Sequence, residues 1–244
     1  MNVQGWLARV SVLVVGVMTA IPVWAQVDVH PSTPMSRSDN DEHGKLDYLF
    51  QVGTRSLYYD LLDNTKGEKF DDSFIGSINR LEADQDYLPL NPYVQILRAF
   101  DPMDAGLGAS YSRMYVDTRD DGGGDGKIET QGLHLYFIGA CNKVAPFRPY
   151  VEGGISFYDN SFDPIASWSE NGKRTFKLDS SVAPYFALGC QYEVASNWSV
   201  DVYLRYCDFD IDGVYVFTGD SRAPEPFTFT MEHIAYGLGA TYSF

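Results

Sequence analysis

The chain has 244 residues, with 33 acidic against 18 basic side chains and a formal net charge of −15. Phosphate binding requires clustered Lys and Arg, so this acidic balance argues against nucleic acid as a partner. The length suits a single all-β domain. The 22 glycines and the aromatic content of 15% fit a membrane barrel, a lipocalin or a sandwich.

The N-terminus, residues 1–25, has the pattern of a secretory signal peptide. Arg9 is its only charged side chain, a short apolar stretch follows, and Ala25 is a small residue at the expected cleavage site. The apolar stretch is shorter than the roughly 20 residues that a membrane-spanning helix requires. Export is therefore predicted, with residues 1–25 removed.

Residues 26–44 are polar and without periodicity, which predicts a flexible periplasmic leader. The folded domain is expected at 45–244. Nowhere in that range is there an apolar stretch long enough for a spanning helix, so a membrane location would require strands.

Strands in the first half are predicted near 45–59, 92–100, 106–117 and 128–141. The first of these changes phase, because its apolar positions are even-numbered up to Val52 but odd-numbered at Leu57 and Tyr59. The second is ambiguous, since Gln95 and Arg98 fall on opposite faces. The facing of these early strands therefore stays open.

The second half alternates more regularly. Strands are predicted near 150–158, 182–193, 198–207 and 234–244. In the last of them the even-numbered residues are apolar, up to Tyr242 and Phe244, and the odd-numbered residues are small or polar. Such a period of two is typical of strands with one apolar face.

The predicted connections alternate between short and long. The short ones are 101–105, 142–148 and 194–197, and the long ones lie near 60–91, 118–127, 159–180 and 208–227. Short turns on one rim and long loops on the other are typical of outer-membrane barrels. The prediction is an all-β fold, an eight-stranded antiparallel transmembrane β-barrel with up-and-down connections and both termini periplasmic.

Three segments carry a resemblance to a known group of proteins. The stretches 149–158 (PYVEGGISFY), 188–208 (LGCQYEVASNWSVDVYLRYCD) and 236–244 (YGLGATYSF) resemble the small outer-membrane barrels of the outer-membrane protein W, X and A type. This resemblance implies an outer-membrane location and a C-terminal aromatic signal, here Phe244 with Tyr242, that the barrel-assembly machinery reads. It says little about function.

Several charged residues fall on the predicted lumen face. Glu152, Asp201 and Arg205 share it, and His134 and His233 do so as well. Buried charges are tolerated only when they are paired. The preferred interpretation is an interior salt-bridge network in which Arg205 pairs with Glu152 or Asp201, and the functional alternative is a polar gate.

Metal and disulfide chemistry are not predicted. The acidic loop at 120–126 lacks the ligand spacing of a calcium-binding loop, although weak divalent binding stays open. A tight hairpin around 194–197 would place Cys190 beside Val200 and Cys207 higher up on the other face. With Cys141 on a distant strand, three free thiols are expected. No metal and no cofactor is expected.

The leading hypothesis is a non-enzymatic, monomeric barrel with a structural or surface-interaction role or one that passes small solutes, including apolar ones. Its expected partners are outer-membrane lipid, lipopolysaccharide and the assembly machinery. The first alternative is a lipid-modifying enzyme, a lipid A acyl hydrolase or acyl transferase. His233 has no Ser after it until Ser243, so the His and Ser of the deacylase barrels are not matched. The second alternative is a soluble lipocalin-like carrier.

Overall fold

The computed structural model describes residues 48–62, 66–67, 80–84, 90–100, 102–120, 123–166, 169, 173–218 and 223–244. The predicted signal peptide (1–25) and leader (26–44) lie outside these residues. The regular elements within them are strands. No helix in this part of the chain is long and apolar enough to cross a membrane.

The described residues contain eleven strands. They are β1 (Tyr48–Leu61), β2 (Lys66–Gly67), β3 (Arg80–Ala83), β4 (Leu90–Ala99), β5 (Met103–Asp120), β6 (Gly123–Cys141), β7 (Phe147–Pro164), β8 (Arg174–Leu178), β9 (Ser181–Ala195), β10 (Trp198–Phe217) and β11 (Glu225–Ser243). Every ladder between them is antiparallel.

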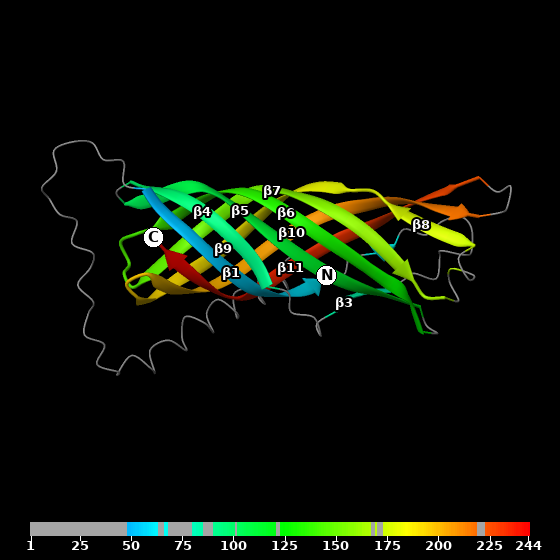
Figure 1. Ribbon diagram of the computed structural model, residues 1–244, viewed down its shortest axis with the longest axis horizontal. Helices are drawn as coiled ribbons and strands as arrows, with labels where there is room; N and C mark the ends of the chain where they lie inside the picture. Colours follow the sequence, from blue (N-terminus) through cyan, green and yellow to red (C-terminus); the bar gives the residue numbers. More distant parts are fainter. Residues whose placement is uncertain are drawn as a thin grey trace, which may run out of the picture. The chain divides into compact units, whose positions relative to one another are not determined.

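The sheet closes on itself (Figure 1). Pairing runs from β1 through β4, β5, β6, β7, β9 and β10 to β11, and β11 pairs with β1. The short strands β2, β3 and β8 pair with β11, β5 and β10. Closure leaves no edge in this ring, which confirms the predicted all-β, antiparallel barrel.

One end of the ring carries short turns. There, residues 100–102 join β4 to β5, 142–146 join β6 to β7, and 196–197 join β9 to β10. Figure 1 shows the C-terminus at this end. The backbone N–H of Phe244 donates to the carbonyl of Phe50 there, at 2.9 Å. We call it the short-turn end and the opposite end the far end.

The outside of the barrel near the short-turn end is an apolar belt. Its exposed side chains include Phe50, Tyr58, Val94, Ile96, Leu107, Leu133, Leu135, Phe137, Val151, Ile155, Phe157, Val182, Phe186, Leu188, Val200, Tyr206, Tyr236 and Leu238. On β10 the belt runs from Trp198 to Tyr206. An outward apolar band of this kind matches the hydrocarbon core of a bilayer.

Toward the far end, the two faces of the strands exchange character. Beyond Tyr206 the outward residues of β10 are Asp208, Asp210 and Asp212, whereas inward Ile211 is fully buried. The strands β5, β6, β7, β10 and β11 have 18 to 20 residues, while about 9–11 suffice to cross a membrane. The barrel wall therefore continues well beyond the belt.

This continuation corrects two of the predicted loops. Residues 118–127 and 208–227 are mainly strand, with connections of only 121–122 and 218–224. On β10 beyond Tyr206, as far as Asp212, the outer residues are polar and the inner residues apolar, the reverse of the belt, so that segment resembles a loop when an apolar outer face is expected. Residues 118–127 have no large apolar side chain and resemble a loop for that reason. The predicted segments 60–91 and 159–180 contain the short strands β2, β3 and β8.

Glycines on the inner face make room for tyrosines of neighbouring strands. Gly53 pairs with Tyr93, and Gly189 pairs with Tyr150. A Cβ atom at Gly189 would lie 2.2 Å from the ring Cζ of Tyr150, and one at Gly53 would lie 2.5 Å from the ring Cζ of Tyr93. Only glycine allows these rings to lie flat against the wall.

The hairpin between β9 and β10 is tighter than predicted. Ala195 pairs with Trp198, and a bulge after Trp198 sets Cys190 opposite Val202 rather than beside Val200. The turn of only 196–197 shifts the pairing by three residues, and the bulge after Trp198 takes one back. Cys141, Cys190 and Cys207 are free thiols.

Candidate functional site

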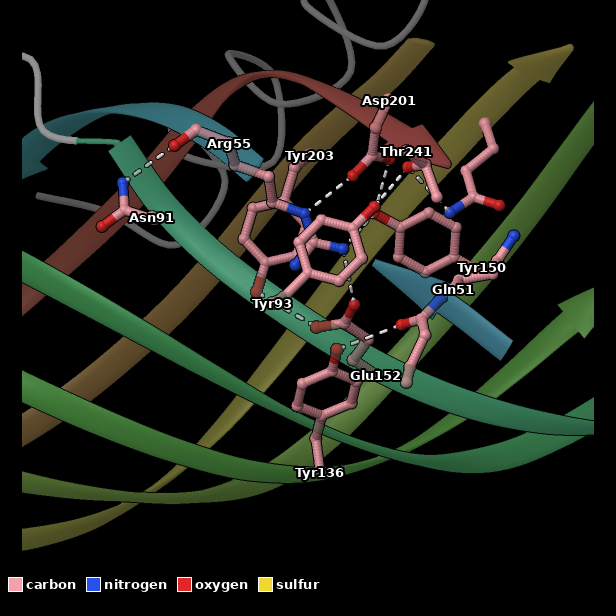
Figure 2. A network of polar contacts seen from close by, with 12 residues as sticks. Gln51, Arg55, Asn91, Tyr93, Tyr136, Tyr150, Glu152, Asp201, Tyr203 and Thr241 are labelled. Atoms are coloured by element: carbon pink, nitrogen blue, oxygen red, sulfur yellow. Dashed lines mark hydrogen bonds and ion pairs between the residues drawn. The ribbon is translucent and has the colours of Figure 1, made fainter. Parts of the chain in front are cut away.

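An arginine between two carboxylates occupies the barrel interior within the belt (Figure 2). Arg55 Nε donates to Asp201 Oδ2 at 2.7 Å, and its Nη2 donates to Glu152 Oε1 at 2.9 Å. The three side chains come from β1, β10 and β7 and are at most 3% exposed. Because each charge has an opposite partner, their burial is tolerable.

Tyrosines complete this arrangement. The guanidinium carbon of Arg55 lies 4.2 Å from the ring centre of Tyr93 and 4.0 Å from that of Tyr203. The Tyr150 hydroxyl donates to Asp201 Oδ1 at 2.7 Å. We call Arg55, Tyr93, Tyr150, Glu152, Asp201 and Tyr203 the central cluster. Figure 2 shows its side chains converging on the guanidinium.

Amide side chains fill the interior between the central cluster and the short-turn end. Gln95 Nε2 donates to Gln51 Oε1 at 2.7 Å, and the Tyr136 hydroxyl donates to Gln95 Oε1 at 3.0 Å. Thr241 shares a hydrogen bond with the hydroxyl of Tyr93, a member of the central cluster. These uncharged groups therefore extend the hydrogen bonding of the central cluster toward the short-turn end.

A histidine layer lies on the other side of the central cluster. Arg205 Nη1 lies 3.0 Å from His134 Nε2, and Ser112 Oγ lies 2.7 Å from the same nitrogen. Guanidinium has only donors, so Nε2 must accept. His134 Nδ1 therefore carries the proton and donates it to Ser156 Oγ at 2.7 Å. We call Ser112, His134, Ser156, Arg205 and His233 the histidine layer.

The predicted partner of Arg205 was wrong. Glu152 and Asp201 pair with Arg55, while Arg205 contacts His134 and the ring of Tyr185, 5.8 Å away. Arg205 lies four residues further along β10 than Asp201, and therefore closer to the far end than the two acids. The two acids and Arg205 all lie inside the barrel, as their predicted face implied.

His233 is also in the interior, 1% exposed, but outside the ion pairs. Its ring lies 5.7 Å from that of Tyr59 and 5.9 Å from that of Phe209. Neither ring nitrogen forms a hydrogen bond to a described side chain. His233 therefore packs among aromatic rings rather than bridging charges.

Arg55 is the functional residue that the sequence analysis missed. The alternation of Phe50, Val52 and Thr54 on the outer face of β1 already places residue 55 on the inner face. Leu57 and Tyr59 share that inner face and are buried. The apparent phase change therefore marks the place on β1 where the belt ends toward the far end. Extending the first alternation would have found the arginine.

Apolar side chains fill the interior toward the far end. We call them the apolar plug, namely Met114, Val116, Ile128, Phe209, Ile211, Tyr215, Phe227, Phe229 and Met231. Each is at most 5% exposed. A water-filled pore would expose side chains at every level, so the described interior is closed from the central cluster to the apolar plug.

One serine and histidine pair in the same interior resembles part of a catalytic arrangement. Ser112 and His134 are in contact, as a nucleophile and base would be, but they are 4% and 0% exposed. The Nε2 atom of His134 is shared with Arg205, and a serine rather than a carboxylate holds Nδ1. No group of three or more His, Cys, Asp or Glu suited to a metal occurs among the described residues.

The two residues of the predicted assembly signal lie together at the short-turn end. The Tyr242 ring contacts that of Phe244, with centres 4.8 Å apart, and that of Trp198, with centres 5.1 Å apart. Phe244 also lies 5.5 Å from Phe50 and is 68% exposed. These rings form an aromatic rim where the belt meets the short-turn end.

No protein-family model and no curated protein sequence matches the chain. Solved structures resemble its fold. The outer membrane protein OprG from Pseudomonas aeruginosa has a TM-score of 0.56 at 16% identity, over 83% of this chain and 97% of that one. The outer membrane protein AlkL, solved in DMPC lipid bilayers, has a TM-score of 0.57 at 14% identity, over 84% and 93%. The chain has the fold of a small outer-membrane β-barrel.

This similarity confirms the predicted barrel fold. The apolar belt is the physical reason to place the barrel in a membrane. Exposed Phe137, Val182 and Leu238 would be unfavourable in water, whereas a closed sheet satisfies its backbone hydrogen bonds within lipid.

Proposed function

We propose that the chain is a non-enzymatic outer-membrane barrel with a closed lumen, which acts through the wall and loops that it displays outside the cell. In this proposal β1, β4, β5, β6, β7, β9, β10 and β11 are the eight transmembrane strands, connected up and down. The length of the strands beyond the belt carries the proposal. About half of β10 lies past Tyr206, with acidic residues on its outward face.

We further propose that the short-turn end and both termini face the periplasm. Short periplasmic turns and longer external segments are the usual arrangement in such barrels. An epitope inserted between residues 218 and 223 should be reached by antibody on intact cells. An epitope at Lys143, in the turn 142–146, should be reached only after the outer membrane is permeabilised. The opposite pattern would reverse the orientation.

The closed lumen is tested by single-channel recording. The purified barrel in a planar bilayer should show no steady conductance, because the central cluster and the apolar plug are buried. A general porin in the same bilayer is the control. Long-lived openings of the wild-type barrel would contradict the proposal.

A second candidate function, passage of small apolar solutes into the bilayer, is favoured by a break between two ladders on β5 among the described residues. The β4 ladder on β5 ends at Ser110, and the β3 ladder begins at Val116. Between them the Asn91 side chain donates to the carbonyl of Arg55 at 3.1 Å and accepts from the N–H of Arg113 at 3.3 Å. A cavity of about 10 Å³ lies behind it, room for roughly one water.

These two functions predict different results with Asn91→Ala. Loss of the side-chain bridge should speed uptake of a small apolar dye into cells if solutes pass through the wall at this point. Uptake equal to wild type, with the barrel folded, would leave surface display as the better proposal. Lipid A mass spectra that are identical with and without the chain would argue against the enzyme alternative.

A further inference from the structure

The apolar belt has a hollow near the short-turn end. Its volume is about 580 Å³, and its lining comes from β1, β4, β5, β6, β7 and β9. The walls are large apolar side chains, including Ile96, Leu107, Phe137, Val151 and Phe186. A hollow on this face is open to lipid rather than to water, because the belt faces the bilayer.

Missing side chains create the hollow. Gly153 is paired with Phe137 on one side and with Phe186 on the other, so two exposed rings flank a position that has no side chain. Apart from its chain neighbours, no described heavy atom lies within 4 Å of where a Cβ of Gly153 would be. Among the described residues nothing fills the space between the rings, and a hydrocarbon chain would fit there.

The basic side chain of Arg98 lies at one end of the same hollow. Arg98 pairs with Ala105, Ala105 pairs with Gly139, and Gly139 pairs with Val151, so the four outward positions form one row across the wall. Arg98 is exposed, with its guanidinium carbon 5.1 Å from the ring centre of Phe100. Among the described residues no acidic side chain pairs with it.

The depth of Arg98 matches that of a lipid headgroup. It is one residue from the end of β4, at the rim formed by the turn 100–102. Long basic side chains at this level extend toward the membrane surface. An arginine fork binds phosphate oxygens in pairs, and anionic headgroups add net attraction.

We propose that the hollow binds one anionic phospholipid, with an acyl chain over Gly153 between Phe137 and Phe186 and the headgroup phosphate against Arg98. The leaflet is the one at the short-turn end. Naming it the periplasmic leaflet rests on the orientation proposed above. The lipid site itself does not depend on that orientation.

Native mass spectrometry of the barrel in detergent, with equimolar phosphatidylglycerol and phosphatidylethanolamine, tests the headgroup contact. Wild type should retain phosphatidylglycerol about fivefold better, as expected for one basic side chain at the surface. Arg98→Gln should abolish the preference, while Lys143→Gln, which removes a charge from a turn outside the hollow, should keep it. Equal retention of both lipids by wild type, or an unchanged preference in Arg98→Gln, would overturn the proposal.

A second variant tests the acyl-chain contact. Gly153→Leu fills the hollow from a position whose Cβ meets no described atom within 4 Å, so the barrel should fold, as heat-modifiable migration on a gel would check. It should lower retention of both lipids. Val182→Leu, an enlargement elsewhere on the belt, is the matched control and should have no effect. Undiminished retention in folded Gly153→Leu would reject the groove, and binding in detergent is independent of which way the barrel inserts.

Discussion

Arg55 and Asp201 are 146 residues apart in sequence, yet Nε of the first donates to Oδ2 of the second at 2.7 Å. Their strands, β1 and β10, are not neighbours, because β11 lies between them. The same guanidinium reaches Glu152 on β7. The contact therefore joins three separate sectors of the wall and requires the ring to be closed.

We expect Arg55→Ala to destabilise the barrel by about 3–5 kcal/mol, because it leaves two buried carboxylates without a cation. Urea unfolding in detergent micelles measures the change. Combining it with Asp201→Asn should restore part of the loss, since one stranded charge is then removed. Arg205→Ala with Asp201→Asn is the control pair, and the two effects should add within about 0.5 kcal/mol. Strong coupling in the control pair would contradict the assignment of partners.

The sequence was most informative within the belt. There the outward positions of β7, β9, β10 and β11 are apolar, so the faces of Glu152, Asp201 and Arg205 followed from alternation alone. The ion-pair partners of these residues did not follow from alternation, because they depend on how far each strand is shifted along the barrel axis relative to the others. The shorter turn before Trp198 and the bulge after it together change the pairing by two residues.

Beyond the belt the same rule misled. Outside lipid, water replaces hydrocarbon as the environment of the outer face, and the apolar side chains move to the inside. Phe209 and Ile211 are buried while Asp208 and Asp210 are exposed, although all four lie on one continuous strand. Apolar and polar residues still alternate along the strand, but the apolar residues now point inward instead of outward.

The glycine and tyrosine pairs predict a sharp difference between two glycines. Gly189→Ala should destabilise by about 1–3 kcal/mol, because the new Cβ collides with the Tyr150 ring and displaces its bond to Asp201. Gly153→Ala on the adjacent strand is the matched control, since its Cβ meets nothing within 4 Å. Urea midpoints in detergent compare the two. Equal costs would mean that strand propensity, rather than ring packing, sets the requirement for glycine.

The exchange of faces predicts the membrane boundary on β10. Single cysteines at Leu204 and Asp208, in a background without Cys141, Cys190 and Cys207, should differ in their reactivity. Position 204 should react with a lipid-soluble thiol reagent, and position 208 with a water-soluble one. A further cysteine at Asp212 should behave like that at 208. Labelling from water at 204 would show that the belt does not face lipid.

Deleting Phe244 should lower the amount of folded barrel in the outer membrane. The deletion removes the backbone bond to Phe50 and one ring of the aromatic rim, but no buried side chain. We therefore expect the refolded protein to keep nearly wild-type stability in detergent. Phe244→Trp should restore assembly in cells, and Tyr242→Ala should impair it. Unchanged levels on deletion would remove the role of the C-terminal aromatic residue.

The acidic outer wall predicts a pH-dependent stability. Asp208 lies outside the belt, and partial burial together with repulsion by Glu232 and Asp210 raises its pKa above the ordinary value. An acid whose pKa is raised by folding favours the folded state when protonated and opposes it when charged, so its contribution falls as the pH rises through that pKa. Asp208→Asn should thus raise the melting temperature of the barrel at pH 8.

This gain in melting temperature should disappear below the pKa of a free aspartate, near 4. Asp179→Asn, at an exposed aspartate after β8, is the control and should change little at either pH. An equal gain at both pH values would show that shape or hydrogen bonding, rather than charge repulsion, explains the effect.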